Sequence, residues 1–315
     1  MTESAALLAR LGGQVVGRRR ELELVLAALA ADRHILLEGP PGTGKSTLLR
    51  AVAGELGVGF EFVEGNAELT PARLVGHFDP ARVITDGYSP DVYQDGPLAT
   101  ALRDGSLLYI EEINRIPEET LNVLVTVMSE GELHVPRLGR IVANRGFRLV
   151  AAMNPFDAVG TARISGAIYD RVCRLAVGYQ PADDEATIVN RSTGSQPTDA
   201  VWVGKVVELV RRTRSHHELR VGSSVRGAID TAMVAVSLGS LRGLPATDST
   251  VGLDAALIAL SGRIRLREGA VRTTEEIVTE LWHDIFGRPD ADSSGDGGDG
   301  EPGKAAAPNG ASPPR

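Results

Sequence analysis

Between residues 15 and 177, short and nearly continuous apolar runs alternate with longer segments of helical periodicity. Four of the runs predict strands, at residues 34–38, 60–63, 106–110 and 147–153. Strands with so few polar positions are typical of a parallel sheet that helices cover on both faces. A further run at 172–177 is expected to add a fifth strand.

Helical periodicity fills the intervals between these strands. The predicted helices lie at residues 46–56, 97–103 and 118–130. Alternating strands and helices imply right-handed crossovers, so we expect an α/β fold: a three-layer αβα core around a parallel sheet.

After Pro181 the pattern changes. Apolar positions recur at helical spacing and no convincing strand follows, so we expect a small, all-helical second domain whose core holds Trp202 and Trp282. The expected organisation is a leader, a nucleotide-binding core, a helical lid and a disordered tail, at residues 1–14, 15–180, 181–286 and 287–315. The tail is rich in Gly, Pro and Asp, which gives it too little apolar surface to form a core.

Composition excludes several classes of protein. A net charge of −8 argues against a nucleic-acid-coating surface. The single cysteine, Cys173, excludes disulfides and Cys-based zinc sites, and its apolar neighbours predict that it is buried. No apolar stretch reaches the roughly 20 residues of a membrane span. The first residues lack a secretion signal, so we expect a cytoplasmic protein.

One motif carries the strongest chemical signal. The run G-P-P-G-T-G-K-S follows a predicted strand and precedes a predicted helix, as a P-loop requires. Its glycines let backbone N–H groups approach phosphate oxygens, and the helix N-terminus adds donors. Lys45 is expected to reach the β- and γ-phosphates, and the Ser46 hydroxyl to bind Mg²⁺. The predicted nucleotide-binding residues are Gly39, Pro40, Pro41, Gly42, Thr43, Gly44, Lys45, Ser46 and Thr47.

Two adjacent carboxylates end the strand predicted at 106–110. Neighbouring side chains on a strand point to opposite faces, so the two acids can take different tasks. We assign Glu111 to Mg²⁺ and Glu112 to the polarisation of the attacking water. Two solvated acids that open a loop are the other interpretation.

The two motifs GPPGTGKS and LLYIEEINRIP together resemble AAA+ ATPases, in particular the MoxR family, which belongs to the helix-2-insert clade and is related to the ATPase subunits of magnesium chelatase. The resemblance spans residues 15–286 and implies a P-loop NTPase fold that uses ATP and Mg²⁺. In that family the second motif normally contains Asp-Glu. Here Glu111 stands in place of the Asp, and its side chain is one methylene longer. Coordination of Mg²⁺ through a water molecule would accommodate the longer side chain. We therefore still expect ATP hydrolysis.

The resemblance gives roles to three further residues. Asn154 resembles the sensor 1 residue, whose amide bonds the γ-phosphate or the lytic water. Arg171 resembles the arginine finger that enters the neighbouring subunit's ATP site. Arg163 and Arg174 are the other candidates for that role, and the alternative for Arg171 is a surface salt bridge. Arg226 opens a helix and resembles sensor 2, acting in its own subunit or in a neighbour.

Two more segments take their interpretation from the family. Residues 15–18 resemble the segment that packs near the adenine, where we expect backbone atoms to make the contacts. Asn66 lies close to where some AAA+ proteins place a polar residue that restrains the catalytic glutamate. On this hypothesis Asn66→Ala releases hydrolysis that needs no partner.

Two insertions narrow the resemblance. Residues 64–93 are too long for a simple connection and resemble the helix-2 insertion. Residues 131–142 alternate around a Leu-Gly turn, which predicts a β-hairpin. We expect a solvated basic face here, with contact to an acidic partner as the alternative; its residues are Arg137, Arg140, Arg145 and Arg148.

These features predict a Mg²⁺-dependent ATPase that works as a ring, a hexamer. The resemblance implies a chaperone-like remodeller in the maturation of a partner protein complex or in metal-cofactor insertion, with a client protein that carries a von Willebrand factor A domain. Two other functions stay open. One is a nucleotide-gated binding module with little hydrolysis; the other is a DNA-remodelling AAA+ motor, which the acidic balance disfavours.

Overall fold

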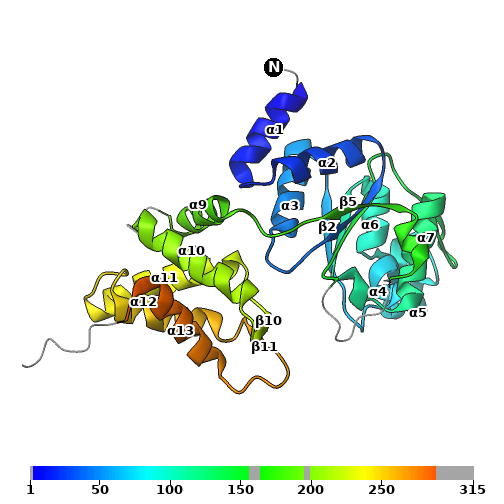
Figure 1. Ribbon diagram of the computed structural model, residues 1–315. Coiled ribbons are helices and arrows are strands. Elements are labelled where there is room, and N and C mark those ends of the chain that lie inside the picture. Colours follow the sequence, from blue (N-terminus) through cyan, green and yellow to red (C-terminus); the bar gives the residue numbers. More distant parts are fainter. Residues whose placement is uncertain (1–2, 156–163, 195–198, 289–315) are drawn as a thin grey trace, which may run out of the picture.

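The computed structural model describes residues 3–155, 164–194 and 199–288 of the chain. A central sheet with its helices is followed along the chain by a bundle of helices (Figure 1). The segment predicted as a leader forms α1 (Glu3–Gln14), and its Leu11 is fully buried. The predicted disordered tail lies outside the described residues from 289 onward.

Five parallel strands form the central sheet, in the spatial order β2-β5-β8-β1-β9. They are β1 (His34–Glu38), β2 (Phe60–Glu64), β5 (Leu107–Glu111), β8 (Arg148–Met153) and β9 (Val172–Ala176). Each agrees with its predicted run to within one residue at either end. The prediction that Cys173 is buried is wrong: β9 is an edge strand, and Cys173 is exposed on it.

Helices cover both faces of the sheet, which confirms the three-layer core. One face packs on α1, α2 (Arg19–Ala30) and α3 (Lys45–Leu56), through residues such as Ile35 and Leu37 of β1. The other face packs on α6 (Pro97–Asp104) and α7 (Glu118–Glu130). Leu36 belongs to that second cluster. The alternation along β1 shows that apolar residues point to both faces, as expected of a covered parallel strand.

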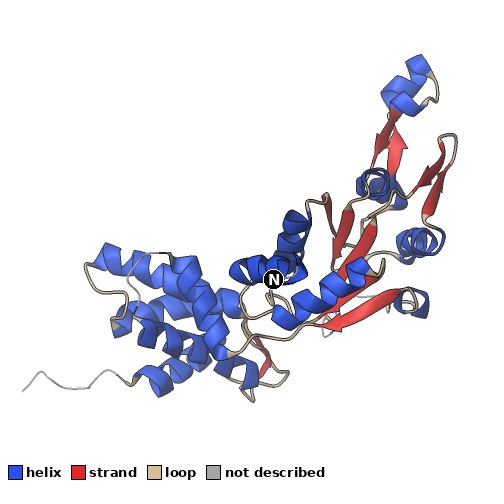
Figure 2. Ribbon diagram, turned by 90° about the horizontal axis from the view of Figure 1, so that it is seen from above, coloured by secondary structure: helices blue, strands red, loops and turns tan. Residues whose placement is uncertain are grey.

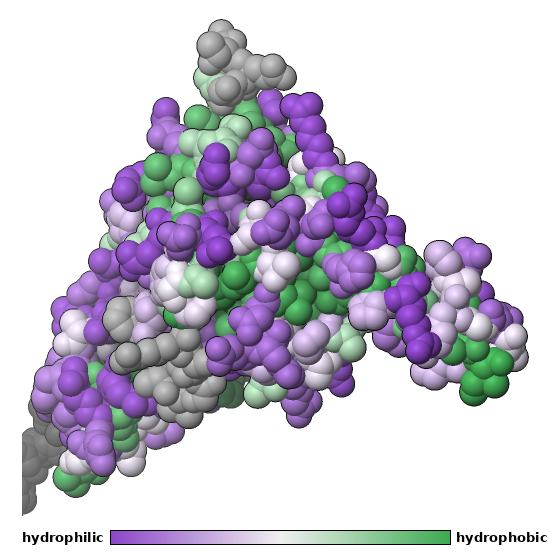
Figure 3. Space-filling model, turned by 90° about the vertical axis from the view of Figure 1, so that its right-hand side faces the viewer, coloured by the Kyte–Doolittle hydropathy of each residue, from purple (hydrophilic) through white to green (hydrophobic). Residues whose placement is uncertain are grey.

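The first insertion forms an arm that projects from the body. The arm consists of β3 (Gly76–Phe78), α5 (Pro80–Asp86), the 3₁₀ turn η1 (Pro90–Val92) and β4 (Tyr93–Asp95), whereas the preceding α4 (Pro71–Val75) packs in the core through the fully buried Leu74. Strands β3 and β4 pair antiparallel and carry α5 outward (Figure 2). The arm appears as a projecting lobe with an apolar patch near its end (Figure 3), and Ile84 of α5 is 87% exposed.

The second insertion is the predicted hairpin, β6 (Glu132–Val135) and β7 (Gly139–Val142). At its turn the Arg137 guanidinium lies 3.9 Å from the centre of the Tyr88 ring, so a cation–π contact joins the two insertions. Arg148 departs from the predicted solvated face. Arg148 forms an ion pair with Asp32, which lies just before β1, and the Arg148 side chain is only 16% exposed.

The helical part follows α8 (Gly166–Tyr169) and β9. It contains α9 (Ala182–Thr193), α10 (Ala200–Ser215), α11 (Val225–Arg242), α12 (Ser249–Leu260) and α13 (Thr274–Phe286). Its own apolar cluster includes both tryptophans, as predicted: Trp202 is 4% exposed and Trp282 is 0% exposed. One feature differs from an all-helical prediction. Strands β10 (Leu219–Val221) and β11 (Arg265–Leu266) form a two-stranded ribbon, too short to leave a periodic pattern in the sequence.

His34 joins two central strands by a side-chain bond. Its Nδ1 accepts a hydrogen bond of 2.9 Å from the Leu149 backbone N–H. Burial, and then the nearby Arg33 charge, lower the pKa of His34 from 6.5 to about 4. Because the folded pKa lies below the ordinary value, acid favours the unfolded chain. The stabilisation is present above pH 6.5 and is lost as the pH falls towards 4.

We therefore predict that the free energy of unfolding falls by about 2 kcal/mol more in the wild type than in His34→Gln between pH 7 and pH 5. Urea unfolding curves at the two pH values measure this difference. The exposed His77→Gln is the matched control and should follow the wild type. An equal pH dependence in wild type and His34→Gln would contradict the prediction.

Candidate nucleotide site

Three adjacent strands bring the predicted site residues to one edge of the sheet. Strand β1 runs into the P-loop, β5 ends at Glu111, and β8 ends one residue before Asn154. The strands are parallel and lie in the order β5-β8-β1, so their carboxyl ends meet. Open α/β sheets bind ligands in the crevice at this edge. The tertiary structure thus brings together three motifs that are far apart in sequence.

Lys45 is the charged centre of the P-loop. It begins α3, is 7% exposed, and donates from Nζ to the carbonyl oxygens of Gly39 and Pro40 at 3.0 Å each. Burial lowers the pKa of Lys45, while the charges of Glu111 and Glu112 act in the opposite direction. A buried ammonium at a helix N-terminus suits an anionic ligand such as a phosphate chain.

The P-loop glycines have conformations that other residues rarely adopt. Gly42 has φ 72° and Gly44 has φ 82°, both in the left-handed region. Gly44 is the N-cap of α3 and supplies no side-chain cap, so the first N–H groups of the helix point towards the loop. A Cβ at Gly42 would lie 2.2 Å from Ser224 Oγ, which shows that the loop touches the helical part directly.

Ser46 and Glu111 form the oxygen donor pair expected for Mg²⁺. Ser46 Oγ lies 3.3 Å from both carboxylate oxygens of Glu111, so the longer side chain reaches the P-loop hydroxyl. Tyr109 OH, fully buried, lies 3.3 Å from the same Oγ. Among the described residues no group of three His, Cys, Asp or Glu could hold a metal. The pair therefore fits an ion that takes few protein ligands and keeps phosphate and water oxygens, as Mg²⁺ does.

Glu112 has a backbone conformation unusual for its residue type. With φ 53° and ψ 45° it lies in the left-handed region, which costs of the order of 1–3 kcal/mol for a residue other than glycine. This turn ends β5 and lets the two acids point in different directions. The Glu112 carboxylate lies 3.6 Å from Arg115 Nε. Strain of this kind is typical of functional sites.

The two predicted amide residues lie on either side of this acid pair. Asn154 follows β8 directly and is half-buried, and the preceding Met153 carbonyl accepts from Gly39 N–H at 3.1 Å. Asn66 follows β2 and bonds within its own turn, donating to the Glu64 carbonyl at 3.2 Å and accepting from the Glu68 N–H at 2.9 Å. The role of Asn66 in restraining Glu112 stays a prediction.

A cleft of about 320 Å³ extends from the P-loop between the core and the helical part. Gly42, Gly44 and Thr47 line its P-loop end. Apolar side chains line it further along: Val15, Val16, Ile188, Val225 and Ile229. This is the arrangement expected for a base held on an apolar wall while its phosphates lie on the loop.

Arg226 lies at the P-loop of its own chain. It is exposed in the first turn of α11 and lines the cleft, and its Cδ lies 3.9 Å from the position of a Cβ on Gly42. Its charge also contributes to the lowered pKa of Lys45. The sequence alone left open which subunit's site this arginine approaches.

Arg18 is a site residue that sequence reasoning missed, because only backbone contacts were expected from residues 15–18. Arg18 is 3% exposed, and its Nη2 donates to the carbonyls of Thr43 at 2.9 Å and Gly178 at 2.6 Å. Its Nη1 pairs with Glu21 at 3.1 Å. The guanidinium thus ties the P-loop to the segment that leads into α9. An arginine followed three residues later by a glutamate was the available signal.

The candidate arginine finger lies beside α8. Arg171 donates from Nη1 to the Ala167 carbonyl at 2.8 Å and from Nε to Ser129 Oγ of α7 at 2.5 Å. Its rival Arg174 pairs with Glu38 at the end of β1. Arg163 lies outside the described residues.

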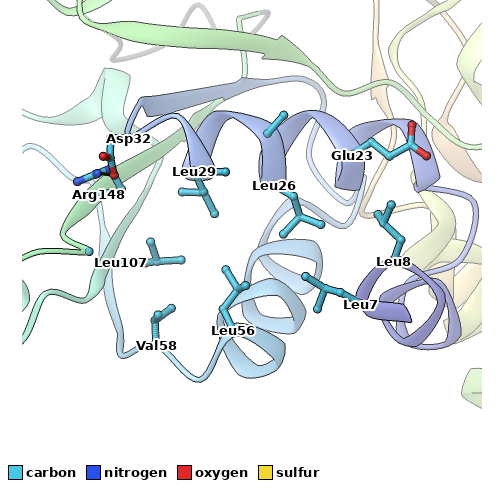
Figure 4. Close-up of a pocket in the computed structure, with 13 residues that line it drawn as sticks. Leu7, Leu8, Glu23, Leu26, Leu29, Asp32, Leu56, Val58, Leu107 and Arg148 are labelled. Atoms are coloured by element: carbon cyan, nitrogen blue, oxygen red, sulfur yellow. Dashed lines mark ion pairs between the residues drawn. The ribbon is translucent and has the colours of Figure 1, made fainter. Parts of the chain in front are cut away.

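A second hollow, of about 500 Å³, lies away from the P-loop (Figure 4). Six leucines from α1, α2, the end of α3 and β5 line it, and Asp32 and Arg148 pair at its edge. No P-loop residue lines it, so it is distinct from the nucleotide cleft.

None of the described helices combines the length and apolar composition needed to cross a bilayer.

Comparison with known proteins agrees with this geometry. Residues 34–172 match the AAA domain, dynein-related subfamily. The chain is 29% identical over 241 residues to the uncharacterized protein YeaC of Bacillus subtilis, a match that covers 68% of this chain and 72% of that protein. It is 30% identical over 233 residues to the gas vesicle ATPase GvpN of Ancylobacter aquaticus, covering 68% of this chain and 64% of that protein.

Solved structures share the fold. A candidate ATPase from Cytophaga hutchinsonii aligns with a TM-score of 0.51 at 20% identity, covering 90% of this chain and 94% of that one. The Holliday junction branch migration motor RuvB of Thermotoga maritima aligns with a TM-score of 0.52 at 16% identity, covering 79% and 72%. Residues 34–172, less than half of the chain, are similar to an AAA domain, and the chain is an ATPase.

Proposed function

We propose that this AAA+ ATPase is a ring-forming, MoxR-type remodeller that hydrolyses Mg²⁺-ATP to act on a partner protein complex during its maturation or metal-cofactor insertion. Residues 15–180 would be its nucleotide-binding core and residues 181–286 its lid. The observation that carries the proposal is the contact of Ser46 Oγ with Glu111 at 3.3 Å beside the buried Lys45.

Each residue at the carboxyl edge of the central sheet would have one role in ATP hydrolysis. Mg²⁺, when bound, neutralises phosphate charge. Ser46 and Glu111 would hold it, and Lys45 with the N–H groups of Gly42–Ser46 would hold the phosphates. Glu112 would accept a proton from the attacking water, and Asn154 would orient that water. Arg226 would sense the nucleotide from the helical part.

A ring would complete the site. Arg171 is placed on the segment between α8 and β9, and in a ring it would stabilise transition-state charge in the neighbouring subunit. AAA+ proteins typically form such rings, and we propose a hexamer. The contact of Gly42 with Ser224 supports a lid that follows the state of the P-loop.

The two insertions would pass this motion to a client. The hairpin packs on the core through Leu133 and Ile141, the arm projects from the core, and the Arg137–Tyr88 contact joins the two, so a movement of the core would reach the arm. The resemblance to the MoxR family implies a client with a von Willebrand factor A domain, and similarity to a gas vesicle ATPase supports action on a protein assembly. Similarity to RuvB is of fold alone and does not favour DNA as the substrate.

Glu112→Gln is expected to lower kcat for ATP by about a hundredfold or more while ATP binding is retained, because general-base catalysis contributes on the order of 10²–10⁴. Steady-state phosphate release with Mg²⁺ measures the rate, and a fluorescent ATP analogue measures binding. The exposed Glu119→Gln of α7 is the matched control. A wild type with no detectable turnover would instead favour a nucleotide-gated binding module.

Mixing subunits tests the ring. Glu112→Gln and Arg171→Ala proteins should each be inactive alone, and their mixture should regain turnover because an intact Glu112 then meets an intact Arg171. Failure of every mixing ratio to restore phosphate release would place the site within one subunit or assign the finger to another arginine.

Arg18→Met should weaken ATP binding by about tenfold, since two bonds from a charged donor that hold the P-loop are lost. Titration with a fluorescent ATP analogue measures the affinity. Arg19→Met is the matched control: Arg19 is the next residue, its side chain is 86% exposed, and it pairs with Glu23 away from the loop. Wild-type affinity in Arg18→Met would show that the guanidinium has no part in binding.

A further inference from the structure

A buried carboxylate stands directly before the P-loop and has no task in the chemistry above. Glu38 ends β1, next to Gly39, and is 4% exposed. One of its oxygens accepts a 2.9 Å hydrogen bond from Tyr169 OH, and the other accepts from Arg174 Nε. A buried charge is retained only when partners of this kind satisfy it.

Both partners of Glu38 flank the candidate arginine finger. Tyr169 precedes Arg171 by two residues, and Arg174 follows it by three. Tyr169 is the last residue of α8, and the Ala167 carbonyl of the same helix accepts from the Arg171 guanidinium at 2.8 Å. Partial burial and the bond to Glu38 raise the pKa of Tyr169, so its hydroxyl stays protonated and donates. The turn that carries Arg171 is therefore tied to Glu38 on both sides.

We propose that Glu38 and Tyr169 are positioning residues for Arg171: they fix the turn that presents its guanidinium to the nucleotide of the neighbouring subunit. This inference rests on the proposed ring. Because Glu38 is bonded to the first residue of the P-loop, the same carboxylate links a subunit's own phosphate loop to the arginine that it lends to its neighbour.

Geometry separates this role from a purely local one. If the Glu38 network served only its own P-loop, its loss would impair the site of the subunit that carries the substitution. If it positions Arg171, its loss impairs the site of the neighbour, and the substituted subunit's own site works whenever the next subunit is intact. Mixed rings distinguish the two cases.

Tyr169→Phe removes one hydroxyl and keeps the ring. In the full-length protein we expect kcat to fall about tenfold and KM for ATP to change by less than about twofold, because a misplaced catalytic group costs rate rather than binding. In an equimolar random mixture with Glu112→Gln, turnover per Tyr169→Phe subunit should then rise about fivefold, since half of those subunits meet an intact finger. Glu38→Gln should show the same pattern.

Two controls make the outcome decisive. Tyr88→Phe removes a hydroxyl from the arm, away from Glu38, and should keep the wild-type rate. Recovery of turnover in the mixture of Arg171→Ala and Glu112→Gln shows whether Arg171 acts in the ATP site of another subunit. The proposal is overturned if Tyr169→Phe keeps the wild-type kcat, or if its mixtures fail to recover while the Arg171→Ala mixture does. If neither mixture recovers, the proposed ring chemistry fails as well.

Discussion

The Lys45 ammonium, buried at the first turn of α3, sets the requirement that the rest of the site meets. Burial disfavours the charged form of Lys45. The carbonyls of Gly39 and Pro40 accept hydrogen bonds from the ammonium, and the negative charges of Glu111 and Glu112 also favour the charged form. A triphosphate is the ligand that satisfies such a cation together with the N–H groups of a helix N-terminus. The order of the parallel strands meets the same requirement, because it places the acid pair beside the loop.

Coupling between the site and the rest of the chain runs through a few buried polar contacts. Arg18 ties the P-loop to the segment before α9, and Ser224 of the helical part touches Gly42. Glu38 ties the start of the loop to the segment that carries Arg171. The nucleotide loop is thus attached to the helical part and to the candidate finger by separate connections. In the proposed ring, such an arrangement would let the state of one phosphate loop reach both the lid and a neighbouring subunit.

The sequence predicted the sheet well, because a covered parallel strand such as β1 is apolar on both faces and leaves a clear signal. The P-loop and acid pair were equally predictable, since local chemistry defines them. Failures arose where tertiary position decides the outcome. Cys173 has apolar neighbours but lies on an edge strand, the β10–β11 ribbon is held by backbone pairing, and the burial of Arg18 depends on the distant Gly178. The approach of Arg226 to its own P-loop likewise required the folded chain.

The central claim is that one edge of the sheet holds Mg²⁺ and triphosphate on residues 39–47 and directs Glu112 to the attacking water. A crystal structure of the full chain with Mg²⁺ and a non-hydrolysable ATP analogue tests this most directly. The account predicts the phosphates on the P-loop, the ion at Ser46 and Glu111, and a water between Glu112 and the terminal phosphate. A vacant P-loop, or a Glu112 carboxylate turned away from that phosphate, would contradict it.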